Sequence, residues 1–310
     1  MELFRLNGFP TEKHYYLFNG DFVDRGSWST EIALLLYAYK WLRPSSFFIN
    51  RGNHETDDMN RVYGFEGECK AKYNGMLPSP LEPVICYQTI LKRSCSNYKH
   101  CSERIFKLFS ESFSALPLAT LIGKKYLVLH GGLFSDDKIT LDDIRKLNRH
   151  NQRQPGQAGL MMEMLWTDPQ TEPGRGPSKR GVGMQFGPDV TKRFCENNGL
   201  DAIIRSHEVR MEGYEEEHDG KCITGTNRQP CFFLLLLIRS QSSQHQDIVT
   251  VLKTKVLISI SALIISSNST NLMLSHTRTS SQWFVKFKLL TVRTQLISIS
   301  RHMHTVVSCR

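Results

Sequence analysis

Short apolar runs recur along the first two thirds of the chain, and polar residues follow each of them. Runs of this length, rich in aromatic and β-branched side chains, predict buried β-strands. We expect four such strands, at residues 15–18, 47–49, 126–129 and 202–204. The segments between them have apolar residues three or four positions apart, which indicates helices. Strands that alternate with helices predict an α/β fold.

The best-defined helix is expected at residues 29–42. Its apolar positions share one helical face: Ile32, Leu35, Leu36, Tyr39 and Leu42. Ser27 or Ser29 is a suitable N-cap, and Pro44 ends the helix. Further helices are expected at residues 2–7, where Gly8 closes the last turn, at 106–115, from Thr140 onward, and at 187–198.

Every expected strand leads into a loop that carries Asp, Asn or His. Because ligands gather beyond the carboxyl ends of strands in α/β sheets, we expect these loops to surround one point. Four side chains would meet there: Asp21, Asn53, His130 and His207.

The first of these loops, residues 20–26, holds two carboxylates and a guanidinium between two glycines. Holding such charges close together in one tight loop is unfavourable in free energy unless a ligand pairs with them. The carboxylates of Asp21 and Asp24 suit a divalent cation, and the planar fork of Arg25 suits phosphate oxygens. A capped turn, an Asp24–Arg25 salt bridge or structural histidines would explain any one loop. Their recurrence in four loops favours metal-assisted phosphate chemistry.

Charge is distributed unevenly along the chain. The 39 Lys and Arg exceed the 30 Asp and Glu, which gives a net charge of +9. Residues 1–224 hold 29 of each sign, whereas residues 225–310 hold 10 basic residues and one acidic residue. The excess therefore lies outside the segment with the polar loops, and we predict no nucleic-acid partner.

The eight cysteines are scattered, and none forms a C-x-x-C pair. The first residues lack a basic segment followed by an apolar one, so we predict no secretory signal and a cytoplasmic or nuclear location. Free thiols are then the default. A zinc site is an alternative for four residues, although their spacing is not a standard one: Cys86, Cys95, His100 and Cys101.

Two segments interrupt the pattern. Residues 75–100 contain three early prolines and no periodicity, which indicates an insertion: a surface loop, retained non-coding sequence or a docking loop. Residues 225–310 contain 14 Ser and 9 Thr, and their apolar stretches are shorter than the roughly 20 residues that span a bilayer. We predict no transmembrane segment. This basic tail is interpreted as translated intron or frame-shifted sequence, with a membrane-associating tail and a genuine domain as alternatives.

Taken in order, the motifs resemble the catalytic domain of the phosphoprotein phosphatase family, the metal-dependent serine/threonine phosphatases. The motifs are GDFVDRG at 20–26, RGNHE at 51–55, HGGLF at 130–134 and IIRSHE at 203–208. The runs at 65–73 and 178–192 are most similar to the protein phosphatase 5 type. The resemblance covers residues 1–224. It implies a calcineurin-like metallophosphoesterase fold, in which helices flank a sandwich of two mixed β-sheets. The chain would lack an early strand and the strands after residue 224.

The resemblance also implies two divalent metal ions, Mn, Fe or Zn. Asp21 matches the carboxylate that bridges them, and Asn53, His130 and His207 match the other ligands of one ion. The second ion would keep only Asp21, because the family's Gly-Asp-x-His-Gly motif is absent and the chain starts just past its place.

The remaining roles also follow from the resemblance. His54 matches the general acid, Asp24 its carboxylate partner, and Arg25 and Arg180 the phosphate-binding arginines. The implied reaction is hydrolysis of phosphoserine and phosphothreonine in proteins by a metal-bound hydroxide, a phosphoric monoester hydrolysis. An inert truncated product and a phosphoesterase acting on nucleotides are the alternatives. Partners that bind through a tetratricopeptide region are not expected, because that region is absent.

Overall fold

A computed structural model describes residues 2–73, 99–225, 235–239 and 248–251, all of which lie in one unit, residues 1–258. The predicted insertion and most of the predicted tail therefore lie outside the described residues. So do Cys86 and Cys95 of the alternative zinc site, and the side chains of His100 and Cys101. The described cysteines Cys69, Cys195 and Cys222 are free and buried.

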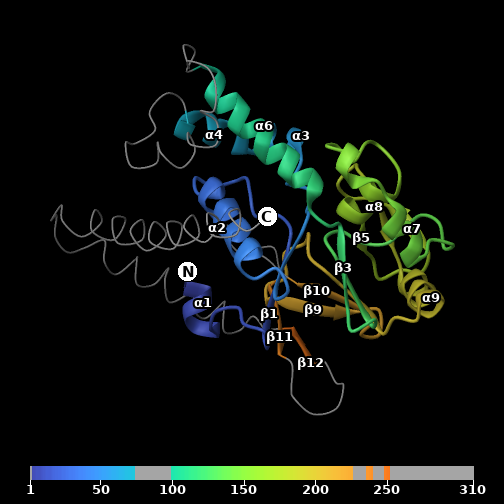
Figure 1. Cartoon of the computed structure of the whole chain (residues 1–310). Coiled ribbons are helices and arrows are strands. Elements are labelled where there is room, and N and C mark those ends of the chain that lie inside the picture. The colour runs from blue at the N-terminus through green and yellow to red at the C-terminus, as the bar shows by residue number, and fades with distance from the viewer. Residues whose placement is uncertain (1, 74–98, 226–234, 240–247, 252–310) are drawn as a thin grey trace, which may run out of the picture. The chain divides into compact units, whose positions relative to one another are not determined.

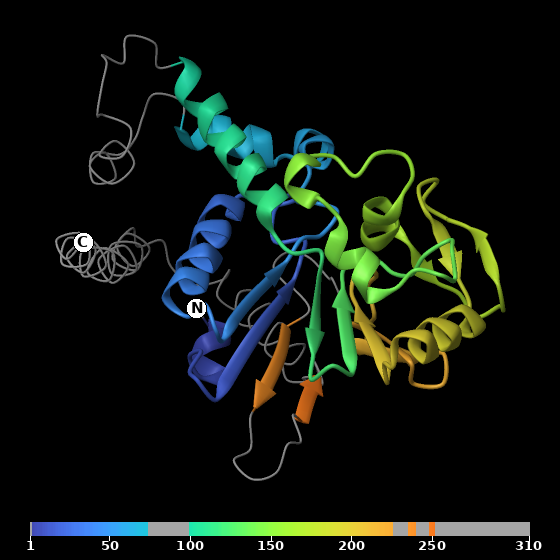
Figure 2. The ribbon, with the colours of Figure 1, turned by 45° about the vertical axis from the view of Figure 1, so that its right-hand side comes forward.

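The first sheet has the strand order β12-β11-β1-β2. β1 (His14–Asn19) and β2 (Phe47–Asn50) are parallel, and β11 (Leu235–Arg239) runs antiparallel on the other side of β1. β12 (Ile248–Val251) completes the sheet. Figure 2 shows orange β11 beside blue β1. Two strands thus lie beyond residue 225, where the sequence predicts none.

The second sheet has the order β3-β4-β8-β10-β9 and is also mixed. Its strands are β3 (Ala119–Ile122), β4 (Tyr126–Leu129), β8 (Ala202–Arg205), β9 (Tyr214–Glu217) and β10 (Cys222–Gly225). A small third sheet joins β5 (Asp168–Pro169), β7 (Met184–Phe186) and β6 (Arg175–Pro177). All four strands predicted from the sequence are present, within one residue at each end.

The two large sheets pack face to face. Leu17 of β1, Val128 of β4 and Ile204 of β8 form one buried cluster, so both sheets contribute to the same core. The neighbouring side chains Tyr16 and Phe18 point to the opposite face of the first sheet, in a cluster shared with helices. This alternation is what a strand with two covered faces requires, and it confirms the expected sandwich.

Helices cover the outer faces of both sheets (Figure 1). The helices grouped with the first sheet are α1 (Glu2–Asn7), α2 (Ser29–Leu42), α4 (Phe65–Tyr73) and α6 (Lys99–Ala115). α3 (Asp57–Tyr63) contacts α4. The helices near the second sheet are α7 (Leu141–Lys146), the 3₁₀ turn η1 (Arg149–Asn151), α8 (Leu160–Trp166) and α9 (Pro188–Asn198). No helix of the described residues is long and apolar enough to span a membrane.

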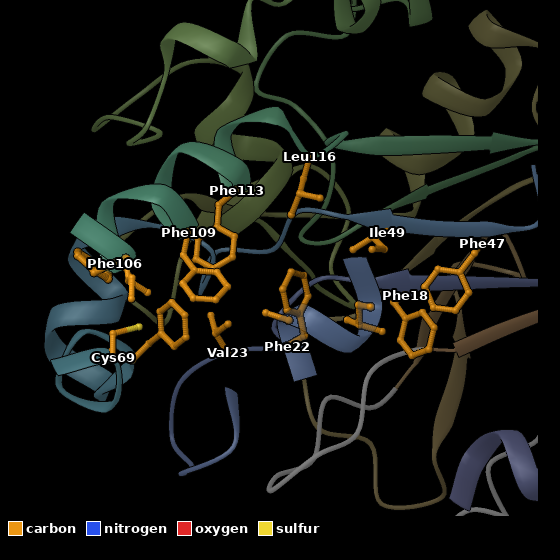
Figure 3. Packing of buried hydrophobic residues seen from close by; sticks show 14 of the residues in the cluster. Phe18, Phe22, Val23, Phe47, Ile49, Cys69, Phe106, Phe109, Phe113 and Leu116 are labelled. Atoms are coloured by element: carbon orange, nitrogen blue, oxygen red, sulfur yellow. The ribbon is translucent and has the colours of Figure 1, made fainter. Parts of the chain in front are cut away.

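Aromatic side chains join α4 and α6 to the loop after β1. The Phe65 ring lies 5.3 Å from that of Phe109 and 5.7 Å from that of Phe113. Phe113 in turn meets Phe22 at 5.9 Å in an edge-on arrangement. Figure 3 shows Phe109 and Phe113 close to Phe22 and Val23. This apolar cluster fixes the base of the loop that carries Asp21 and Asp24.

The ends of α2 agree with the sequence prediction, but its cap does not. Trp28 occupies the N-cap position without a side-chain bond. Glu68 of α4 instead accepts the N–H groups of Ser29 and Thr30, at 3.1 and 2.8 Å. The buried face centres on Ala33 and Leu36, and Leu42 is 48% exposed. The prediction that Ser27 or Ser29 caps α2 is therefore wrong.

Candidate active site

A seam of buried polar side chains joins the carboxyl ends of the two sheets. Asn19 donates to the Leu129 carbonyl at 2.8 Å, and Asn50 donates to Asn19 Oδ1 at 2.9 Å. Ser206 donates its hydroxyl to the Asn19 carbonyl at 3.1 Å. Because buried polar groups must pair, these bonds fix how the strand ends meet. The four polar loops of the sequence start at this seam.

The loops after β1 and β2 interlock at two glycines. Gly20 has a φ of +81°, and a Cβ placed on it would lie 2.4 Å from the Gly52 nitrogen. A Cβ on Gly52 would lie 2.5 Å from Asp21 Oδ1. Asp21 and Asp24 also have positive φ angles, 55° and 73°, which non-glycine residues rarely adopt. Only glycine at positions 20 and 52 lets the two loops approach this closely.

Glu55 holds both loops through their backbone. Its carboxylate accepts the N–H groups of Asp21 at 2.8 Å, Phe22 at 2.8 Å and Gly52 at 2.7 Å. Burial, and next the nearby Asp21, raise the pKa of Glu55 to about 7, whereas these N–H donors favour its ionised form. No role in the chemistry was predicted for Glu55. In the structure its carboxylate holds the two loops together.

Three of the predicted metal ligands meet at one point. His130 Nε2 lies 3.3 Å from Asp21 Oδ1 and 3.0 Å from Asn53 Oδ1. Its other ring nitrogen, Nδ1, is 2.7 Å from the Asn19 carbonyl and donates its hydrogen there. With Nδ1 as the donor, Nε2 faces two oxygen atoms, an arrangement that a cation between them stabilises. Burial raises the pKa of Asp21, but His130 and His54 outweigh it and hold that pKa well below its ordinary value.

His207 lies on the far side of His130, with ring centroids 5.2 Å apart. Both of its ring nitrogens are buried and have no hydrogen-bond partner within the described residues. Burial, and next His130, lower its pKa well below the ordinary value, which keeps the imidazole neutral as metal ligation requires. His207 thus lies beside His130 as a buried donor without a hydrogen-bond partner in the described part of the chain. No group of three or more His, Cys, Asp and Glu in the described ranges forms a metal cluster by itself.

His54 and Asp24 form a buried pair beside these residues. His54 Nδ1 lies 2.8 Å from Asp24 Oδ2. The Asp24 carboxylate also accepts from Asn60 Nδ2 at 3.1 Å and from the Phe65 N–H at 2.9 Å. Burial lowers the pKa of His54, but Asp21 and then Asp24 outweigh it and raise the pKa above its ordinary value. His54 therefore retains a proton more readily than a free imidazole.

The two arginines flank the site from different elements. The Arg25 guanidinium lies over the Tyr63 ring, 4.7 Å from its centroid. No ion pair joins Arg25 to Asp24 among the residues that the structure describes, so the salt-bridge alternative is not what the structure shows. Arg180 donates from Nε to Asp168 Oδ2 at 2.6 Å and from a terminal nitrogen to the His207 carbonyl at 3.1 Å.

Sequence reasoning missed Asp168, which organises the Arg180 side of the site. It also accepts from Arg205 at 2.7 Å and lies 3.5 Å from His207 Nδ1. Burial raises the pKa of Asp168, but Arg205 and also Arg180 outweigh it and lower that pKa. The one available signal was a carboxylate directly before Pro169, at the end of an apolar helix.

Two mixed sheets in a sandwich, with Asp, Asn and His loops at one end, define a calcineurin-like phosphoesterase. A family model of that description matches residues 1–211, and the chain belongs to this family. Within it, the chain is 77% identical to serine/threonine-protein phosphatase T of Aspergillus oryzae over 224 residues, which are 72% of this chain and 41% of that protein. It is 52% identical to human serine/threonine-protein phosphatase 5, over 72% of this chain and 39% of that one.

A solved structure shows the same arrangement of elements. It is a protein serine/threonine phosphatase from Saccharomyces cerevisiae with similarity to human phosphatase PP5, which is 42% identical to the chain. The match covers 81% of this chain and 78% of that one, with a TM-score of 0.63. The chain itself spans about two fifths of the length of the curated relatives that it matches.

Proposed function

We propose that the chain is a metal-dependent protein serine/threonine phosphatase that hydrolyses phosphoserine and phosphothreonine in proteins. The buried His54–Asp24 pair beside the predicted metal ligands carries this proposal. The names of the relatives favour it over an inert product. We also propose that the catalytic part is residues 1–224 and that the protein acts in the cytoplasm or nucleus.

His54 is proposed as the general acid that protonates the leaving serine or threonine oxygen. Because Nδ1 faces Asp24, Nε2 is the nitrogen that presents a proton to the substrate. The raised pKa of His54 keeps that proton in place near neutral pH. Asp24 fixes the ring orientation and stabilises the imidazolium.

Arg25 and Arg180 are proposed to bind the phosphoryl oxygens from two directions. Arg180 is already oriented by Asp168 and the His207 carbonyl, so its remaining donors are preorganised. Arg25 is exposed, and Tyr63 neighbours both Arg25 and His54. Two guanidinium groups stabilise the charge that accumulates on the transferred group.

Asp21, Asn53, His130 and His207 are proposed to hold one divalent ion, Mn, Fe or Zn. A divalent ion at a phosphate site polarises phosphoryl oxygens and acidifies bound water. Ligation by nitrogen and oxygen without thiolate suits these three metals.

Turnover of a phosphothreonine peptide by the full 310-residue chain with excess Mn²⁺ tests the proposal. We expect hydrolysis by the wild-type chain and a rate about 10²–10⁴-fold lower in His54→Asn, because general acid catalysis contributes that much. Metal content, measured by mass spectrometry, should be equal in the two proteins. Metal-bound wild-type protein without turnover would support the inert alternative. Loss of metal in the variant would make His54 a ligand.

A further inference from the structure

The Arg25 side chain packs against the aromatic ring of Tyr63. Its guanidinium carbon lies 4.7 Å from the centroid of Tyr63, and among the described residues it makes no ion pair with a carboxylate. A guanidinium over a π-face is held by that face and keeps its N–H groups available for hydrogen bonds to other partners. Those are the groups that bind phosphate through two parallel hydrogen bonds.

Tyr63 is itself held against the loop that carries Arg25. The Arg25 N–H donates to the Tyr63 carbonyl at 3.0 Å. Tyr63 is the last residue of α3, and Gly64 ends the helix with a φ of +110°. On either side of this turn, Asn60 and the Phe65 N–H bind the Asp24 carboxylate. Both the backbone and the ring of Tyr63 are therefore attached to the loop that carries Arg25.

The same ring also borders His54. The two ring centroids lie 5.0 Å apart with an interplanar angle of 59°. Tyr63 is 40% exposed, so one part of the ring faces solvent while the rest separates Arg25 from His54. A flexible, exposed arginine would lose much side-chain entropy on binding phosphate, and a preformed stacking surface reduces that loss.

We propose that Tyr63 is a positioning residue, which holds Arg25 in the orientation that binds the phosphoryl group of a phosphorylated peptide. This inference rests on the proposed function for its substrate class. The ring acts through Arg25 and makes no contact with substrate in this role. Its effect should therefore depend on the presence of the arginine.

Binding of inorganic phosphate to the Mn²⁺-loaded full chain, measured by calorimetry, tests the inference without relying on turnover. We expect Tyr63→Leu and Tyr63→Gln to weaken phosphate binding about 3- to 10-fold, as loss of a cation–π contact predicts. Tyr63→Phe, which keeps the ring, should stay within about twofold of wild type. Val62→Ala, next to it and 71% exposed, is the matched control and should change nothing.

A double-mutant cycle separates positioning from a structural role. In an Arg25→Ala chain, Tyr63→Leu should weaken phosphate binding by less than about twofold more. Equal weakening with and without Arg25, or a Tyr63→Phe variant as weak as Tyr63→Leu, would overturn the inference. A wild-type chain that binds phosphate without hydrolysing the peptide would overturn the proposed function. The double-mutant cycle would still test the inference, because it measures phosphate binding alone. A wild-type chain that binds no phosphate would overturn the inference itself.

Discussion

Three donors converge on the carboxylate of Asp24, from a histidine ring, an amide side chain and a backbone N–H. This arrangement fixes the rotamer of Asp24 and, through it, the ring of His54. Asn60 adds a second link, because the same amide group also donates to the His54 carbonyl at 2.7 Å. The acid proposed for the reaction is therefore oriented by α3 as well as by its own loop.

Replacing Asp24 should slow the reaction without emptying the metal site. We expect Asp24→Asn to lower kcat about 10–100-fold, as loss of an orienting partner at metal sites often does. Asp58→Asn removes an exposed carboxylate of α3, the helix that contains Asn60. It should have no effect on kcat and serves as the control. Equal kcat values for Asp24→Asn and wild type, at equal metal content, would contradict an orienting role.

At the residue scale, the sequence identifies residues that follow strands and misses those that helices supply. Asp21, Asn53 and His130 were predictable because strand ends share one edge of a sheet. Asn60 and Tyr63 look like ordinary helix residues in the sequence. Their roles arise from contacts with Asp24 and Arg25, far along the chain, which no local pattern records.

At the scale of single elements, the start of α2 depends on a carboxylate from another helix. Glu68 accepts two N–H groups of the first turn of α2 and pairs with Lys72 at 2.9 Å. Burial raises the pKa of Glu68, but the bonds from Thr30 and Lys72 outweigh it and lower the pKa below its ordinary value of 4.5. The ionised carboxylate therefore stabilises the contact between α2 and α4.

Glu68→Gln should lower the free energy of unfolding by about 1–2 kcal/mol at pH 7, measured in urea. Because folding lowers the pKa of Glu68, its contribution is complete above the unfolded value and is lost as pH falls through the folded value. The difference between wild type and Glu68→Gln should thus shrink below about pH 4.5. Glu66→Gln, whose ion pair with Lys70 is at the surface, is the control. A difference that does not depend on pH would exclude this linkage.

The ends of α2 could be predicted from spacing, but its cap could not. A serine near the first turn is the usual cap, and the sequence offers two. The tertiary contact with Glu68 satisfies the same N–H groups and leaves the serines unused. α7 shows the opposite case, because Thr140, where the sequence predicts the helix to start, forms a capping box with Asp143 of the same short segment.

At the scale of the whole molecule, the proposed metal ion would join the two sheets. Asp21 and Asn53 follow strands of the first sheet, and His130 and His207 follow strands of the second. The seam of buried polar side chains, with Asn19 and Asn50, already brings these strand ends together. An ion held by all four side chains would oppose their separation, so metal binding and folding should be coupled.

Adding Mn²⁺ should therefore raise the Tm of the chain. At a concentration of about 100 times Kd we expect a rise of about 5–10 °C, measured by calorimetry. His207→Ala should abolish most of this rise, whereas His150→Ala, at an exposed position outside the site, should keep it. The same rise in His207→Ala would mean that the ion binds elsewhere.

The pairing of β1 with β11 has a consequence for how the protein is made. β1 leads into the Asp21 loop and is made long before β11, yet Phe18 pairs with Leu235 and His14 with Arg239. During synthesis this edge of β1 has no partner until almost the whole described chain has emerged. An unpaired strand edge is a template for pairing with another chain. The nascent protein therefore exposes an unpaired strand edge until β11 has been made.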